Sequence, residues 1–317
     1  MTQAQGPVGR PPAVVAGDAA VFEAPARPVE IAGRGALARF FGRTPVHVAI
    51  VVICHLWTIP TVALFVSSFR PERATAETGW WTAFQLPFQF TLANYGEVLT
   101  ARNMGTSFIN SLFVAIPSTV IPIMVAAFAA YAFAWMNFPG RQILFVVVVG
   151  LLVIPLQSTL ITLLQLLGPQ GLDIVGTFPA IWLAHTGYGL PFSIYLLRNF
   201  FGQLPREMFE SAYIDGASPV TAFFRLALPT SVPAIASLAI FQFMWTWNDL
   251  LVALIFLGGN QRVAPMTVTI GNLVQSLGQG WQLLAPAAFI SMMLPLLIFF
   301  GLQRYFVRGI LGGSVKG

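Results

Sequence analysis

Six long apolar runs, separated by polar segments, constrain this chain more than any other feature. Each run reaches or exceeds the ~20 residues with which a helix crosses the hydrocarbon core of a bilayer. Charged residues make up only 9% of the chain, against roughly 25% in a soluble domain. The predicted fold class is therefore an all-α membrane protein with six transmembrane helices and no large soluble domain. The runs are Val46–Phe69, Thr106–Trp135, Ile143–Leu167, Thr177–Leu197, Val232–Leu257 and Leu283–Phe306.

The distribution of Lys and Arg sets the predicted orientation. Basic residues gather in loops on the cytoplasmic side of a membrane. With the N-terminus inside, twelve basic residues are internal and four external, which sum to the 16 of the chain. We therefore expect both termini in the cytoplasm. The internal residues are Arg10, Arg27, Arg34, Arg39, Arg43, Arg141, Arg198, Arg206, Arg225, Arg304, Arg308 and Lys316, and the external ones are Arg70, Arg73, Arg102 and Arg262.

The ends of the chain differ from its middle. Residues 1–45 are rich in Ala, Pro, Gly and Val, and we interpret them as a disordered cytoplasmic tail and not as a signal peptide. Residues 46–308 form the predicted six-span domain, and residues 309–317 a cytoplasmic C-terminal tail. Cys54 is the single cysteine, which excludes an internal disulfide. The external segment carries aromatic side chains suited to a membrane interface: Trp80, Trp81, Phe84, Phe88 and Phe90.

The internal loop at residues 199–231 has a helical pattern of its own. Pro205 suits the start of a helix, and Gly216 suits its end in a left-handed cap. Ser218 and Pro219 then suit the N-cap and first position of a second short helix. Two short helices meeting at a glycine would form a compact projection on the cytoplasmic face.

Two uses of this projection are compatible with its pattern. It could fit a groove on another protein, or it could lie on the lipid surface. A lipid-surface helix usually presents many basic residues, whereas the polar side here has one basic residue and three acidic ones, which favours a protein partner. The apolar stripe is Met208, Phe209, Ala212 and Tyr213, and the polar side is Arg206, Glu207, Glu210 and Asp215.

The same loop carries a family resemblance. Glu210-Ser211-Ala212, Gly216 and Leu226-Ala227-Leu228-Pro229 resemble the EAA loop of permease subunits from binding-protein-dependent ABC importers. The family pattern is E-A-A-x3-G-x9-I-x-L-P, and this sequence fits it without a gap. Ser211 in place of Ala and Leu226 in place of Ile are mild departures.

Further segments extend the resemblance over nearly all of the chain after the tail. Together they are similar to the shorter, six-span permease of the maltose-transporter type of sugar importer. The segments are Asn94-Tyr95, Asn110-Ser111-Leu112, Tyr131-Ala132-Phe133, Phe138-Pro139-Gly140-Arg141, Ile154-Pro155-Leu156-Gln157, Trp247-Asn248-Asp249 and Gly313-Ser314-Val315-Lys316-Gly317.

The resemblance implies a type I ABC importer permease in the plasma (inner) membrane of a prokaryote. It implies a second homologous permease, two ATP-binding subunits that hold ATP and Mg, and an extracytoplasmic sugar-binding protein that delivers a di- or oligosaccharide. This chain has no G-x4-G-K-[ST] phosphate loop, so we expect a non-catalytic subunit. By the resemblance, the ATPase would dock on a coupling helix made of Met208, Phe209, Glu210, Ala212, Asp215 and Gly216.

The fifth run suggests a substrate site. Asp249 is the only acidic residue well inside a predicted span, where a charge costs about 2.5–3.5 kcal/mol on insertion scales. Polar groups can bind sugar hydroxyls and indole rings can pack on sugar C–H faces. Alternatively, Asp249 caps a helix or pairs between helices, and the amides hydrogen-bond between helices. The candidate substrate residues are Gln157, Gln242, Trp245, Asn248 and Asp249.

Other functions remain as alternatives. Glycerol phosphate or another polar solute could be the cargo, but a phosphate should bring Arg or Lys into the pathway, and the spans carry none away from their ends. An ion-coupled secondary transporter usually shows repeats or several buried ionisable groups. His55 and His185 are isolated in sequence, so we predict no metal site. The net charge of +5 reflects cytoplasmic loops and not nucleic-acid binding.

Overall fold

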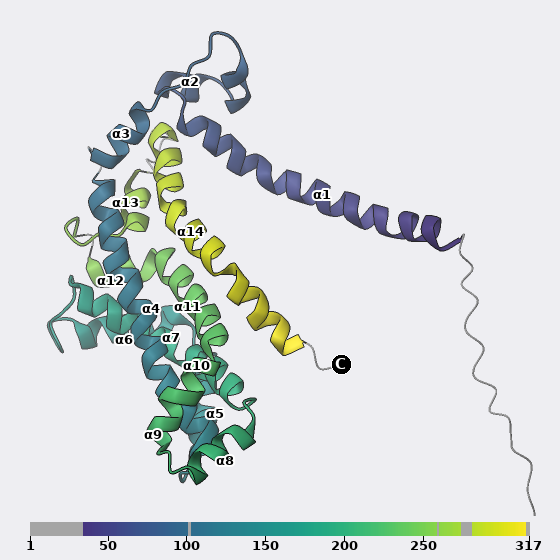
Figure 1. Ribbon diagram of the computed structural model, residues 1–317. Helices are drawn as coiled ribbons and strands as arrows, with labels where there is room; N and C mark the ends of the chain where they lie inside the picture. Colours follow the sequence, from purple (N-terminus) through teal and green to yellow (C-terminus); the bar gives the residue numbers. More distant parts are fainter. Residues whose placement is uncertain (1–33, 101–102, 259, 274–280, 315–317) are drawn as a thin grey trace, which may run out of the picture. The chain divides into compact units, whose positions relative to one another are not determined.

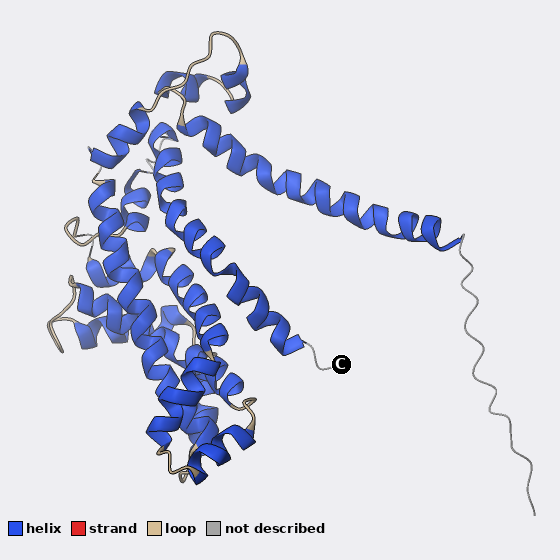
Figure 2. Ribbon diagram, in the orientation of Figure 1, coloured by secondary structure: helices blue, strands red, loops and turns tan. Residues whose placement is uncertain are grey.

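The computed structural model describes residues 34–100, 103–258, 260–273 and 281–314, and this part of the chain contains helices and no strand (Figure 2). The α-helices are joined by one 3-10 helix, η1, and one π-helix, η2. The elements are α1 (Arg34–Ser68), α2 (Glu72–Glu77), η1 (Trp80–Phe84), α3 (Ala93–Thr100), α4 (Met104–Trp135), α5 (Arg141–Leu151), α6 (Leu156–Leu167), α7 (Phe178–Phe201), α8 (Arg206–Ile214), α9 (Pro219–Ala222), η2 (Phe223–Ala227), α10 (Leu228–Thr230), α11 (Val232–Trp247), α12 (Leu251–Leu257), α13 (Met266–Leu273) and α14 (Trp281–Ser314).

The apolar runs correspond to helices, and the all-α membrane class is confirmed. In the described part, three helices are long and apolar enough to span a membrane, and up to five spans result if each of two bent pairs counts as one. Helix α7 has 24 residues but falls outside this set, because His185, Tyr188 and Pro191 lower its hydropathy. Six spans therefore stays a prediction.

The ends of the chain are more helical than the sequence suggested. Helix α1 begins at Arg34, so residues 34–45, whose composition predicts a disordered tail, continue the first apolar run as helix. The rest of that predicted tail, residues 1–33, lies outside the described residues. At the other end, α14 continues to Ser314, into the predicted C-terminal tail.

The described residues divide into two compact units, which meet between Thr58 and Ile59. In the second unit α4 packs along α7, α11 packs on α4, and α14 packs on α11 (Figure 1). Small residues line these contacts: Ala126 and Ala130 on α4 and Ala184 on α7 are fully buried. Small side chains let helix backbones approach closely in a membrane protein.

Two of the predicted runs are interrupted, and a third bend lies where the internal loop enters the fifth run. Helices α5 and α6 meet at 102°, where Pro155 cannot donate to the helix ladder. The helix that ends at Thr230 meets α11 at 73°. The fifth apolar run is itself divided, because α11 ends at Trp247 and α12 begins at Leu251. We call residues 248–250 the α11–α12 break.

Two buried polar side chains hold the segment between α1 and α3 through hydrogen bonds to its backbone. Arg70 is only 2% exposed, and it donates to the carbonyl oxygens of Ala74 (2.8 Å) and Thr78 (3.1 Å) at the end of α2. Asn94 donates to the carbonyl oxygens of Ser68 (3.1 Å) and Arg70 (2.8 Å). The aromatic side chains of Trp81, Phe84, Phe88 and Phe90 are exposed on the same segment.

Candidate functional site

The loop between α7 and α11 folds as its local sequence predicts. Helix α8 follows Pro205 and ends before Gly216, whose φ of 83° is left-handed. The Ala217 amide donates to the Ala212 carbonyl at 2.9 Å, which closes the helix end in the manner of a left-handed cap. The predicted turn at Gly216 is confirmed.

A second helix follows at once. The Ser218 side chain accepts from the Thr221 amide at 3.2 Å, and Pro219 takes the first helical position. This confirms the predicted N-cap. The helix then widens into the π turn η2 at Phe223–Ala227, which no local signal in the sequence indicated. π turns often occur at functional sites.

Helix α8 is held against α4 of the same chain. The Phe209 ring stacks on Trp135 with centroids 3.9 Å apart, and it is 1% exposed. The Trp135 indole donates to the Phe201 carbonyl at 3.0 Å, and the hydroxyls of Tyr131 and Tyr213 lie 3.2 Å apart. Phe209 was expected to face a partner ATPase, but its ring is occupied inside this chain. Met208 is half-buried in the same cluster.

The free surface of the loop contains part of the predicted coupling set together with residues that the sequence did not single out. Ile214 is 87% exposed, Val220 65% and Phe224 52%. Of the predicted coupling residues, Glu210, Asp215 and Gly216 are exposed and Ala212 is half-buried. We define the outer loop face as Ile214, Val220 and Phe224 with the neighbouring acids Glu210 and Asp215. Ile214 is not part of the apolar stripe predicted from the sequence. The stripe is the side of α8 that packs against α4, so the exposed apolar residues lie elsewhere.

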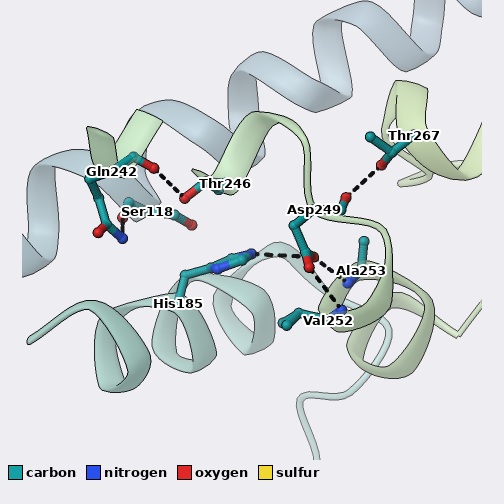
Figure 3. A network of polar contacts seen from close by, with 8 residues as sticks. All are labelled: Ser118, His185, Gln242, Thr246, Asp249, Val252, Ala253 and Thr267. Atoms are coloured by element: carbon teal, nitrogen blue, oxygen red, sulfur yellow. Dashed lines mark hydrogen bonds and ion pairs between the residues drawn. The ribbon is translucent and has the colours of Figure 1, made fainter. Parts of the chain in front are cut away.

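The α11–α12 break is organised by Asp249 (Figure 3). Its carboxylate accepts hydrogen bonds from the backbone amides of Val252 (3.3 Å) and Ala253 (3.0 Å) in the first turn of α12. Its backbone carbonyl accepts from the Thr267 hydroxyl of α13 at 2.7 Å. The carboxylate therefore caps a helix start, which is the structural alternative left open for this residue.

His185 is the residue at this break that the sequence did not reveal. Its ring on α7 is 0% exposed, and Nε2 lies 3.7 Å from Asp249 Oδ2. Within the described residues, no group of three or more His, Cys, Asp or Glu side chains could hold a metal ion. The two residues are 64 positions apart, and only the packing of α7 on α11 and α12 brings them together.

The other substrate candidates do not converge on Asp249. Gln242 is 3% exposed and donates to the Ser118 carbonyl at 3.2 Å. Asn248 donates to the Met244 carbonyl at 2.7 Å, and Gln157 is exposed on α6. These contacts fit hydrogen bonding within the bundle.

Trp245 instead lines a pocket between α6, α7 and α11. The pocket has a volume of about 500 Å³ and is mainly apolar, with Tyr188, Ser158, Thr159 and Thr162 as its polar members. Thr159 donates to the Tyr188 hydroxyl at 3.2 Å. An aromatic wall with a few hydroxyl groups is compatible with an uncharged ligand.

Comparison with known proteins gives consistent matches. Residues 107–312 match the family model described as "Binding-protein-dependent transport system inner membrane component". The osmoprotective compounds uptake permease protein GgtD of Synechocystis sp. is 58% identical over 280 residues, which cover 87% of this chain and 93% of that relative. The alpha-glucoside transport system permease protein AglG of Rhizobium meliloti is 56% identical over 255 residues, covering 80% and 67%.

Solved structures match the fold. The crystal structure of a bacterial ABC transporter involved in the import of the acidic polysaccharide alginate aligns with a TM-score of 0.69 at 20% identity. The alignment covers 86% of this chain and 98% of the matched chain.

Proposed function

Because the chain belongs to the family of binding-protein-dependent transport system inner membrane components, we propose that it carries a neutral di- or oligosaccharide through the membrane as one permease of an ATP-driven importer. The observation that carries the proposal is the 56% identity, over 80% of this chain, to a permease named for alpha-glucoside transport. An alpha-glucoside is therefore the first substrate to test.

The chemistry of the bundle supports an uncharged cargo. The pocket at Trp245 offers aromatic faces and hydroxyls and has no Lys or Arg among its lining residues. A phosphorylated solute needs cationic partners. Asp249, the acid of the fifth run, uses its carboxylate to cap α12. This carboxylate is therefore not needed to bind a positively charged substrate, and an uncharged sugar fits the bundle.

ATP would be bound and hydrolysed by other subunits and not by this chain. We infer that two ATP-binding subunits, which hold ATP and Mg, are the partners of this permease and its homologous second permease, and that an extracytoplasmic binding protein supplies the sugar. Both termini would lie in the cytoplasm. The outer loop face is the docking surface on this chain. The exposed apolar side chains of Ile214 and Val220 can enter a groove, and the exposed acids Glu210 and Asp215 can pair with basic residues of the partner.

The contacts of α8 suggest how a pull on the loop reaches the membrane. Phe209 and Tyr213 connect α8 to α4 through Trp135 and Tyr131. On its other side the loop continues through η2 and α10 into α11. Closure of the ATPase subunits would therefore move both α4 and α11, and the pathway between the two permeases would open outward.

The direct test is reconstitution. The complete importer, purified from its native membrane through this chain, would be placed in liposomes with its binding protein, and uptake of a labelled alpha-glucoside would be measured with and without ATP. ATP-dependent uptake supports the proposal. Uptake without ATP, by the chain alone, would assign it to ion-coupled secondary transport.

A second candidate cargo comes from the relative of 58% identity, which is named for osmoprotective compounds. The same liposomes would be tested with small polar osmolytes in competition with the labelled sugar. Competition that exceeds that of unlabelled alpha-glucoside would replace the proposed substrate and leave the proposed ATP coupling intact.

A further inference from the structure

The buried imidazole of His185 is a polar group without a hydrogen bond. Both ring nitrogens lack a partner among the described residues, and the side chain is 0% exposed. An unsatisfied buried donor or acceptor destabilises the state that contains it. This conformation therefore carries a cost at His185 that another arrangement of the same helices could remove.

Asp249 is the group that could satisfy it. A carboxylate offers about four lone-pair positions, and the amides of Val252 and Ala253 occupy one on each oxygen. Oδ2 retains a position and lies 3.7 Å from His185 Nε2. A hydrogen bond between nitrogen and oxygen requires about 2.7–3.2 Å, so a movement of roughly 0.5–1 Å would complete it.

The surrounding contacts show which parts such a movement would involve (Figure 3). Asp249 is attached to α12 by its carboxylate and to α13 by the Thr267 hydroxyl. Trp247, at the end of α11, donates from its indole to the Ser291 carbonyl of α14 at 3.0 Å. His185 belongs to α7 and contacts the edge of the Trp245 ring, with centroids 5.7 Å apart. Four helices therefore meet α11 at this break.

The break also lies at the far end of α11 from the outer loop face. The π turn and α10 lead into α11 at Val232, and α11 ends at Trp247. A displacement of the loop along α11 would reach the break directly.

We propose that His185 is a positioning residue for the transport step, whose Nε2–H donates to Asp249 Oδ2 in the alternate transport conformation and sets the angle between α11 and α12 there. The proposal rests on the proposed function. In the conformation described here the bond is open, and in the alternate conformation it closes.

Two amide substitutions distinguish the nitrogens of the ring. His185→Gln places an amide N–H near the position of Nε2, whereas His185→Asn reaches only as far as Nδ1. His185→Leu removes both donors. Each variant would be made in the complete importer in liposomes, with its binding protein and ATP. Initial uptake of alpha-glucoside, ATP hydrolysis and the yield of assembled complex would be measured together.

The expected result is that Gln retains at least half of the wild-type ratio of sugar transported to ATP hydrolysed. Asn and Leu should lower that ratio at least tenfold while the yield of complex stays within twofold of wild type. In a double-mutant comparison, Asp249→Asn should have a smaller effect in the His185→Leu background than in the wild type, because the His185–Asp249 bond is already absent there, while the loss of a capping bond to α12 is the same in both backgrounds.

Several outcomes overturn the proposal. One is equal ratios in Asn and Gln, and another is a wild-type ratio in Leu. Loss of assembly in Asn also counts against it, since that would place His185 in folding and not in transport. A wild-type complex that hydrolyses ATP but takes up no alpha-glucoside refutes the proposed substrate alone, because the same ratio can then be measured with the polar osmolyte as cargo. A wild-type chain without an ATPase refutes both proposals.

Discussion

The ring of Phe209 on α8 stacks on the indole of Trp135 on α4, with centroids 3.9 Å apart and planes inclined by 25°. This contact joins the loop between α7 and α11 to the 32-residue helix α4. The EAA resemblance implies that Phe209 docks on a partner, whereas this contact shows that its ring attaches the loop to its own chain. The following predictions separate these two roles.

Replacing Phe209 by Ala should detach α8 from α4. Removal of a buried Phe side chain typically costs about 3–5 kcal/mol, and the ring is 1% exposed here. We expect a lower midpoint of thermal unfolding for the complex in detergent and loss of sugar-stimulated ATP hydrolysis. Phe209→Leu, which keeps most of the apolar volume, should lose less. Equal unfolding midpoints for wild type and the Ala variant would contradict the buried role.

Replacing Ile214 by Asp should leave the stability of this chain unchanged and weaken its binding to the ATPase. The side chain is 87% exposed, so stability of the isolated chain should change by no more than about 0.5 kcal/mol. An unpaired charge at the centre of a docking surface should nevertheless reduce copurification of the ATPase at least tenfold. Leu86→Asp is a matched control, since Leu86 is 81% exposed on the segment between α1 and α3. A similar loss in both variants would argue against docking at Ile214.

Substitutions at Gly216 should be ranked by backbone conformation and not by size. Its φ is 83°, and a Cβ added there would meet nothing within 4 Å. Left-handed backbone costs most L-residues roughly 1–2 kcal/mol and Asn less, while Pro is excluded by its fixed φ. We expect ATPase copurification to decrease in the order Gly, Asn, Ala, Val, Pro. An Ala variant better than Asn would remove the conformational explanation.

Replacing Arg70 by Met should loosen the segment between α1 and α3. Burial lowers the pKa of the Arg70 guanidinium, but an arginine remains charged at neutral pH, so its loss leaves carbonyl groups of α2 without their donor. We expect faster proteolysis within residues 71–92. Arg73→Met is the control, because the Arg73–Glu77 pair at 3.1 Å is exposed and such pairs contribute about 0–1 kcal/mol. Equal cleavage rates in the two variants would argue against the role given to Arg70.

Local signals predicted local structure well. Gly216 and Ser218 each act through the backbone within four residues of themselves, so their sequence context suffices to place the two short helices. Pro155 lies at the bend between α5 and α6, which was not predicted from the sequence. Prolines 117 and 122 remain inside α4, because neighbouring helices in a membrane bundle can compensate a proline. Proline alone therefore did not distinguish a bend from a continuous helix.

Contacts between distant segments could not be predicted in this way. Phe209 and Trp135 are 74 residues apart, and His185 and Asp249 are 64 apart. The apolar pattern of α8 indicates a stripe but not which surface covers it, and the resemblance implies that Phe209 docks on an ATPase, whereas its ring is buried within this chain. At Asp249 the unusual acid could be identified from the sequence and capping was one of its two interpretations, but the position of the α11–α12 break could not be predicted, since no Gly or Pro marks it.

The π turn at Phe223–Ala227 makes the number of residues in the loop as important as their identity. A π turn contains one residue more than an α-helical turn, and one residue corresponds to about 100° of rotation in an α-helix. Insertion or deletion of a single residue between Pro219 and Leu228 would therefore turn α10 relative to α9. We therefore expect the loop to tolerate substitutions between Gly216 and Leu226 more readily than a change in the number of residues between them.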